Sequence, residues 1–224
     1  SFNYYHQQGN PILQVRITSD NYNSFTAKSF KSAFDHMTYS FHIARNRLGL
    51  SSSLCGTGFS VNKEVFEEVG FTDCTTLTED LEFSVKSIIR GYKVKFIEYE
   101  YVRNQNLDEF MPSIKQRKRW NTGTCQVTKK MNKQIIKSFF KRPRIQLIDT
   151  LIFINSPIRS VLYIFTIIMT ILGFNMNEFP AVNYVNLMTI VYQFLYIAYT
   201  NKLKPIYMIA HIFYSLTMGV LIPY

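Results

Sequence analysis

The chain has 224 residues, of which 18% are charged and 16% aromatic, and its formal net charge at pH 7 is +10. This length accommodates one large domain, or a smaller domain followed by a membrane part. The positive charge alone is compatible with nucleic acid, but the sequence contains no recognisable nucleic-acid module, so we expect no nucleic-acid partner. Three cysteines, Cys55, Cys74 and Cys125, have neither disulfide-framework nor metal-ligand spacing, which favours reduced thiols.

The first part of the chain alternates between helix and strand signals. Residues 1–8 are expected to end a helix, because Gly9-Asn10-Pro11 cannot continue one. A strand is predicted from Ile12 to Ile17, and a long amphipathic helix over residues 30–48. His36 and His42 lie on that helix at a spacing that does not place them on one face, so no metal site is expected there.

The segment Cys55-Gly56-Thr57-Gly58 places two glycines around a hydroxyl residue, just ahead of a short predicted strand. On its own, such a segment is equally well an ordinary glycine turn. A short helix is then predicted from the cap residue Asn62 to Gly70. With a further helix after Thr78 and a strand over residues 93–97, the pattern is mixed α/β.

Thr78-Glu79-Asp80 lies where a helix should begin. Thr78 is a good N-cap residue, and apolar residues then recur at helical spacing until Gly91. Asp80 falls in the first turn, where unpaired amides and the helix dipole favour a charged carboxylate. We therefore expect Asp80 to be ionised at neutral pH and able to accept a proton, the alternative being a helix cap with two acidic residues.

Gln116-Arg117-Lys118-Arg119-Trp120 brings together a planar amide, three cations and the only tryptophan of the chain. A guanidinium can hold a diphosphate through two parallel hydrogen bonds, and an indole face can carry a sugar ring or a base. Taken alone, this segment would more often be a solvated basic turn.

Together, Cys-Gly-Thr-Gly, Thr-Glu-Asp and Gln-x-x-Arg-Trp resemble the membrane-embedded family 2 glycosyltransferases, which include cellulose, chitin, hyaluronan and poly-N-acetylglucosamine synthases. The resemblance implies an inverting enzyme that transfers a sugar from a nucleoside diphosphate donor, expected to be a UDP-sugar, to a growing polysaccharide. It implies these roles: Asp80 as general base oriented by Glu79; Gln116, Arg119 and Arg117 at the donor diphosphate; Trp120, Cys55, Gly56 and Thr57 at the acceptor. Cellulose synthases have two aromatic residues before the Cys-Gly pair, where this chain has Ser53-Leu54.

Members of this family hold a divalent metal, magnesium or manganese, with an Asp-x-Asp pair. This sequence contains no such pair, so we expect the metal ligands to lie upstream of Ser1. The chain also opens without an initiator methionine and ends within an apolar run. We therefore predict that it is a fragment holding the C-terminal half of a GT-A domain, and that it is inactive by itself.

A strongly basic segment follows the Trp120 motif. Residues 115–144 contain eleven basic residues and no acidic one. Apolar residues and lysines each recur every four residues on opposite sides of a predicted helix: Val127, Met131, Ile135 and Phe139 on one side, and Lys129, Lys133, Lys137 and Lys141 on the other. We predict an amphipathic helix in the plane of a membrane surface, the alternative being a charged helix that packs on its own domain.

Three apolar stretches, near residues 151–174, 184–200 and 205–224, predict about three transmembrane helices. The loop charges predict a multi-pass membrane protein whose catalytic domain is cytoplasmic. The predicted organisation is a partial GT-A domain over residues 1–125, an amphipathic interface segment over 126–149 and a transmembrane region over 150–224.

The expected partners are a nucleotide sugar, a glycan or lipid acceptor, and membrane lipids. Two alternatives to polysaccharide synthesis remain open. One is the non-processive transfer of a single sugar to a lipid acceptor, and the other is a catalytically silent membrane scaffold.

Overall fold

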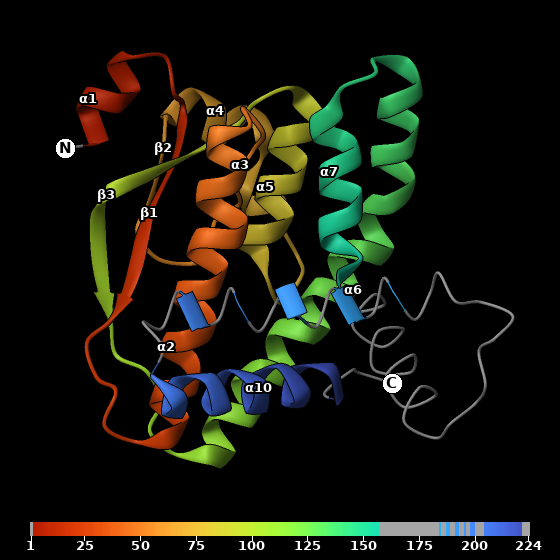
Figure 1. The fold of residues 1–224 in the computed structure, drawn as a ribbon. Helices are drawn as coiled ribbons and strands as arrows, with labels where there is room; N and C mark the ends of the chain where they lie inside the picture. The colour runs from red at the N-terminus through yellow and green to blue at the C-terminus, as the bar shows by residue number, and fades with distance from the viewer. Residues whose placement is uncertain are drawn as a thin grey trace, which may run out of the picture.

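The computed structural model describes residues 2–156 and 204–220, together with positions 184, 187, 188, 191, 192, 195, 198 and 199. A small sheet stands beside a group of helices, and α10 runs across the lower ends of α2 and α6 (Figure 1). The strands are β1 (Ile12–Ser19), β2 (Phe59–Val61) and β3 (Val94–Asn104). The helices are α1 (Phe2–Gln7), α2 (Phe25–Met37), α3 (Ala44–Arg47), α4 (Lys63–Val69), α5 (Glu79–Arg90), α6 (Phe110–Lys141), α7 (Ile145–Ile154) and α10 (Pro205–Val220), with a π-helical segment (Thr38–Ile43) and a 3₁₀ turn (Phe71–Asp73).

The three strands form one sheet in the order β2-β1-β3. The central strand β1 is antiparallel to β2 and parallel to β3, and Ile12 pairs with Val61 on one side and Val94 on the other. The pairing with β3 shifts after Val15, because Val15 lies opposite Ile97 whereas Arg16 lies opposite Tyr101. The parallel pair is possible because the chain between β1 and β3 is long enough to cross over through helices.

Helix α5 lies at the centre of the packing. Its residues Leu81, Val85 and Ile88 join a buried cluster with side chains of α6 and α7. Its Phe83 joins a second cluster with Ile12 and Val94 of the sheet. Because α5 is held on both sides, the position of its N-terminal turn is fixed by the core.

The helix predicted to lie on a membrane surface packs on its own domain instead. Val127, Met131 and Ile135 of α6 are at most 1% exposed and pack against α5 and α7. Lys130, next to this apolar side, forms a 2.6 Å ion pair with the buried Glu82 of α5, whereas the lysines of the cationic side, Lys129, Lys133, Lys137 and Lys141, are exposed. The interface prediction is therefore wrong, and the predicted boundary between residues 125 and 126 falls inside α6.

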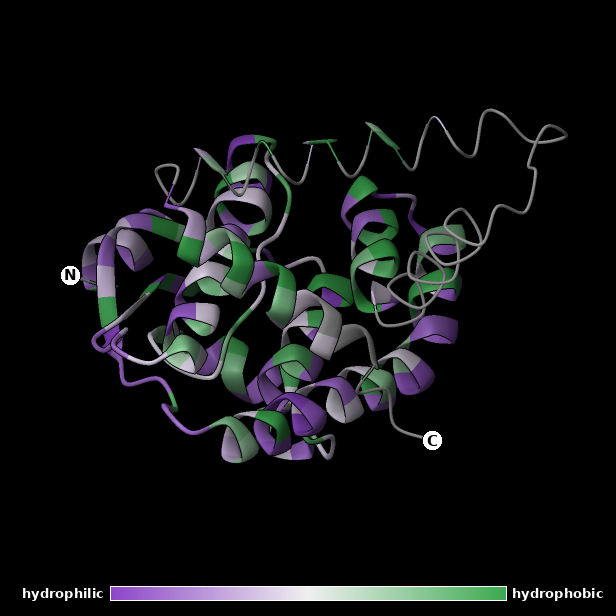
Figure 2. Cartoon of the chain, turned by 60° about the horizontal axis from the view of Figure 1, so that its bottom comes forward, coloured by the Kyte–Doolittle hydropathy of each residue, from purple (hydrophilic) through white to green (hydrophobic). Residues whose placement is uncertain are grey.

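The membrane predictions need correction as well. Within the described residues, no helix is both long enough and apolar enough to cross a membrane. Helix α7 has 10 residues and α10 has 16, fewer than the ~20 that a bilayer requires. Hydrophilic and hydrophobic residues are interspersed along the described part of the chain (Figure 2).

The predicted α/β fold with transmembrane helices is thus replaced by a mostly helical fold with a small three-stranded sheet. The predicted multi-pass membrane protein with a cytoplasmic catalytic domain is not supported by these helices. Most of the first predicted span, at positions 157–174, and much of the second lie outside the described residues.

The long helix predicted over residues 30–48 is present, but it contains a π-helical segment. Helix α2 runs through Thr38–Ile43 into α3 with the joining residues in right-handed helical conformation. Within this segment Phe41 and His42 are both buried, although they are consecutive. Phe41 packs against Phe153 of α7, whereas His42 stacks on Phe96 of β3.

Candidate active site

The N-terminal turn of α5 presents Asp80 at the edge of the core. Thr78 occupies the N-cap position and Gly91 the left-handed C-cap position, as predicted. In the part of the chain that the structure describes, the Thr78 hydroxyl makes no capping bond. Instead, Oδ1 of Asp80 accepts a 2.8 Å hydrogen bond from the Leu81 amide, which leaves Oδ2 for other contacts.

The backbone at Gly56 lies next to that second oxygen. A Cβ atom added at Gly56 would lie 3.5 Å from Oδ2 of Asp80. Gly56 has φ of 75°, which residues with a side chain rarely adopt. The Cys55-Gly56-Thr57 segment thus brings a bare stretch of main chain, with Gly56 and Thr57 exposed, alongside the Asp80 carboxylate.

Helix α6 rests directly on the turn that precedes Asp80. A Cβ atom added at Gly123 would lie 2.5 Å from Cγ2 of Thr78 and 2.9 Å from its backbone nitrogen. Three residues further along α6, Gln126 Oε1 accepts a 3.0 Å hydrogen bond from the Leu77 amide. These contacts place the Gln116–Trp120 segment, which ends three residues before Gly123, beside the start of α5.

The environment of Asp80 raises its pKa. Burial is the largest cause, and the charge of Glu79 acts in the same direction. The hydrogen bond from the Leu81 amide and the charge of Arg119 lower the pKa but do not cancel this effect. The expectation that the helix start favours the ionised form therefore omitted the dominant effect, which is desolvation.

Gln116, Arg119 and Trp120 share one face of α6, since positions three and four residues apart are neighbours on a helix. Arg119 is exposed, and Gln116 and Trp120 are half-buried. The Trp120 ring meets Phe30 and Phe34 of α2 edge to face, at centroid distances of 6.0 and 6.1 Å. Those two rings fix the orientation of the indole.

Arg117 has a different environment from Arg119. At ~100° per residue, the two side chains leave α6 about 200° apart. Arg117 is fully buried, its Nη2 donates a 3.1 Å hydrogen bond to Ser29, and its guanidinium lies 4.2 Å from the Tyr214 ring centroid. Burial lowers the pKa of Arg117. The structure therefore places Arg117 within the packing of α2, α6 and α10 and does not bring it together with Asp80.

Cys55 and His42 form a contact that the sequence did not suggest, with Sγ of Cys55 at 3.5 Å from Nε2 of His42. Burial and the nearby charge of Asp80 raise the pKa of Cys55 to about 12. Burial and the charge of Arg45 lower the pKa of His42 to about 3. Both groups are therefore neutral at physiological pH, which argues against a thiolate–imidazolium nucleophile.

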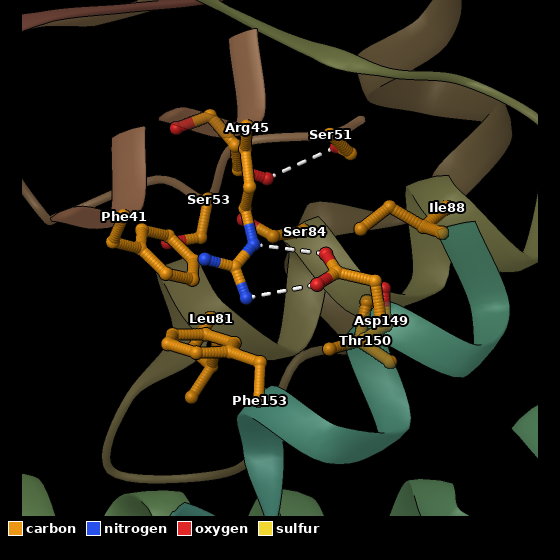
Figure 3. A pocket seen from close by; sticks show the side chains of 12 residues that line it. Phe41, Arg45, Ser51, Ser53, Leu81, Ser84, Ile88, Asp149, Thr150 and Phe153 are labelled. Atoms are coloured by element: carbon orange, nitrogen blue, oxygen red, sulfur yellow. Dashed lines mark hydrogen bonds and ion pairs between the residues drawn. The ribbon is translucent and has the colours of Figure 1, made fainter. Parts of the chain in front are cut away.

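A pocket behind Leu81 is occupied by an ion pair (Figure 3). Arg45 of α3 donates two hydrogen bonds, of 2.8 and 2.9 Å, to the Asp149 carboxylate of α7. Its guanidinium lies 3.7 Å from the centroid of the Phe41 ring. The pocket joins α3 to α7 behind the turn that carries Asp80, so its contribution is to hold the helices around the site.

The described residues do not fit a carboxylate-rich metal centre. Among them, no group of three or more His, Cys, Asp or Glu side chains could hold a metal ion. The described residues supply a half-buried carboxylate, the charge of Arg119 and a side-chain-free backbone at this site.

The chain is similar to known glycosyltransferases. The chain is 30% identical over 108 residues to glucomannan 4-beta-mannosyltransferase 7 of Arabidopsis thaliana, covering 46% of this chain and 19% of that protein. It is 29% identical over 94 residues to "Probable glycosyltransferase YdaM" of Bacillus subtilis (strain 168), covering 42% of this chain and 22% of that protein. The matched regions thus span about a fifth of the length of these relatives. Residues 2–219 match the family described as Glycosyl transferase family group 2, and the chain belongs to that family.

Proposed function

We propose that this chain forms the acceptor side of an inverting glycosyltransferase, which transfers a sugar from a nucleoside diphosphate donor to a growing polysaccharide. A UDP-sugar is the expected donor. The observation that supports this most directly is that three separate segments approach one another: the Gly56 backbone lies next to the Asp80 carboxylate, and α6, which carries Arg119, packs on the Thr78 turn before Asp80. Family membership supports the reaction class.

Asp80 is the proposed general base. As the acceptor hydroxyl attacks the anomeric carbon, its proton passes to the carboxylate, the new carbon–oxygen bond forms, and the bond to the diphosphate breaks. The diphosphate leaves with the electron pair, so a single displacement inverts the anomeric centre. A raised pKa suits this role, because a base is most effective when its pKa approaches the working pH. Glu79, the exposed neighbour, contributes through its charge, which raises the pKa of Asp80 further.

Arg119 and Gln116 are the proposed contacts of the departing diphosphate. Both lie on the face of α6 that also carries Trp120, and Arg119 is exposed. A guanidinium can donate paired hydrogen bonds to phosphate oxygens and stabilises the charge that develops there. Arg117 does not share this role, because its side chain is buried in the packing of α2, α6 and α10.

Trp120 and the Gly56 segment are the proposed acceptor contacts. The indole is held from one side by Phe30 and Phe34, so its remaining surface is oriented for stacking on a sugar ring. The exposed Thr57 hydroxyl can hydrogen-bond to the same acceptor. Cys55, whose thiol is buried and neutral, supports the loop rather than the chemistry.

The test is an acceptor-dependent transfer assay with the full-length protein. A panel of UDP- and GDP-linked sugars is offered with oligosaccharide acceptors, with and without manganese, while nucleoside diphosphate release and product length are measured. Mannosyl donors belong in this panel, because two relatives are named as glucomannan mannosyltransferases.

The matched variants are Asp80→Asn and Asp73→Asn, the latter an exposed acid in the 3₁₀ turn. We expect Asp80→Asn to slow transfer by ~10²–10⁴-fold and Asp73→Asn to leave the rate unchanged. Absence of transfer from every donor, or a fully active Asp80→Asn variant, would overturn the proposal. Elongated products support polysaccharide synthesis, whereas products extended by one sugar support single transfer.

A further inference from the structure

Gln14 is a buried polar side chain in the first, mostly apolar half of strand β1. It is 1% exposed, and its neighbours Leu13 and Val15 point to the other face of the sheet, where they pack with Ile97. The Gln14 amide oxygen accepts a 2.9 Å hydrogen bond from the Cys55 amide. The amide nitrogen donates to three carbonyl oxygens, at 2.9 Å to Val15, 2.9 Å to Thr57 and 3.3 Å to Gly58.

These bonds tie both ends of the Cys55–Gly58 loop to a single side chain. A glutamine side-chain amide has an acceptor oxygen and an NH₂ group with two donor hydrogens on the same carbon. The loop offers one N–H and two carbonyl oxygens, so the two sets of groups match. Gly56, the residue that faces Asp80, lies between the anchored ends. Without Gln14, the Cys55 amide and the Thr57 carbonyl would lose these partners, and such a loss is costly in a buried setting.

The same loop is linked to the backbone of Asp80 by Ser84. The Ser84 hydroxyl accepts a 2.8 Å hydrogen bond from the Leu54 amide and donates a 2.8 Å hydrogen bond to the Asp80 carbonyl. Helix α5 is held on both sides by the core. If the Cys55–Gly58 loop moves, Asp80 therefore stays in place, and the distance between the loop and Asp80 changes.

We propose that Gln14 is a positioning residue for the transfer reaction: it holds the Cys55–Gly58 backbone at the spacing from Asp80 that the acceptor hydroxyl needs. This inference rests on the proposed function. Gln14 touches no reacting atom in this scheme, and it acts through the loop that it anchors.

The first experiment measures loop order directly and does not depend on activity. Backbone amide hydrogen exchange is followed in the full-length protein for peptides that cover the Cys55–Gly58 loop. Gln14→Met keeps the side-chain length but removes the hydrogen bonds, and we expect exchange in the loop to become at least about tenfold faster. Leu13→Ala, on the opposite face of the same strand, is the control and should leave loop exchange unchanged. Unchanged loop exchange in Gln14→Met would overturn the proposal.

The second experiment separates positioning from stability. We expect Gln14→Met to reduce kcat for transfer by about 100-fold, the effect of a displacement of roughly 1 Å at a reacting centre, with the donor KM unchanged. Gln14→Glu keeps an acceptor for the Cys55 amide but sets a carboxylate oxygen against the Thr57 and Gly58 carbonyls, so its kcat should fall at least as far as that of Gln14→Met. Leu13→Ala should lower Tm without lowering kcat.

The results distinguish the two proposals. If kcat falls in proportion to Tm in all three variants, Gln14 has only a structural role and the inference fails. If the wild-type protein transfers no sugar from any donor, the proposed function fails. An active Gln14→Met variant with wild-type kcat overturns the role of Gln14 alone.

Discussion

A methyl group added at Gly123 tests the contact between α6 and the turn that precedes Asp80. The new Cβ would lie 2.5 Å from Cγ2, 2.7 Å from Oγ1 and 2.9 Å from the backbone nitrogen of Thr78. Carbon atoms pack favourably at about 3.5–4.0 Å, so the helix and the turn must separate by roughly 1 Å. Because one contact is to backbone, a rotation of the Thr78 side chain cannot relieve the clash by itself.

Two opposing effects set the expected change in stability. In a helix interior, glycine to alanine stabilises by about 1 kcal/mol, whereas overpacking a close contact costs about 1–3 kcal/mol. The free energy of unfolding of Gly123→Ala should therefore fall by roughly 0–2 kcal/mol. Transfer should slow by about 100-fold, because Arg119 and Trp120 lie one helical turn before Gly123 and move with it relative to Asp80.

The assay pairs urea denaturation with the initial rate of transfer. Thr122→Ala is the control, because the adjacent position gains helix propensity without approaching Thr78. A Gly123→Ala variant that is about 1 kcal/mol more stable than wild type and fully active would refute the close approach of α6 to the turn.

Three further substitutions test the charges around α5. The folded state raises the pKa of Asp80, mainly through burial, so ionisation of this carboxyl group destabilises the fold. Asp80→Asn should therefore raise Tm at pH 7, and a lower Tm would contradict this reasoning. Removing the cation in Arg119→Gln should raise the pKa of Asp80 further. At saturating donor this would shift the acidic limb of the kcat–pH profile to higher pH, whereas a shift to lower pH would argue against an effect of the Arg119 charge on Asp80. Burial alone would raise the pKa of Glu82, but hydrogen bonds, with Lys130 first among the donors, hold it at about 2, below its ordinary 4.5. The ionised Glu82 carboxylate therefore stabilises the fold fully above pH 4.5, and this stabilisation is lost as the pH falls toward 2. Glu82→Gln should lower the free energy of unfolding by roughly 3–5 kcal/mol at pH 7 and by less at pH 3. Chemical denaturation at both pH values measures this difference.

Local signals in the sequence predicted the elements that carry the site. Asn62 and Gly70 bound α4, and Thr78 and Gly91 bound α5, as their capping preferences indicated. The start of β1 at Ile12 was also predicted correctly. These features depend on residues close together in the chain, so a single sequence contains the information needed to find them.

Features that depend on distant partners could not be predicted in the same way. Strand β3 continues to Asn104 because its second half pairs with β1 beyond the register shift, and the position of that shift depends on the partner strand. The basic run around Arg117 gave no sign that this cation is buried by side chains of α2 and α10. Gln14 could have been noticed as the lone polar residue between apolar neighbours, but its loop partners are more than 40 positions away.

Dependence on distant partners also explains why α6 was wrongly predicted to lie on a membrane surface. The spacing of Val127, Met131 and Ile135 correctly identified an apolar helix face, but periodicity does not say what covers such a face. In the structure it is covered by α5 and α7.

The number of residues in the π-helical segment between α2 and α3 decides which side chains of this helix face the core. A π turn holds one more residue than an α-helical turn, and it lets Phe41 and His42 face inward together, one toward Phe153 of α7 and the other toward the loop at Ser52. Deleting one residue from its outer side, such as the exposed Tyr39, would let the run close into regular α-helix and turn one of these two side chains away. This stretch should therefore accept substitutions on its outer side far more readily than insertions or deletions.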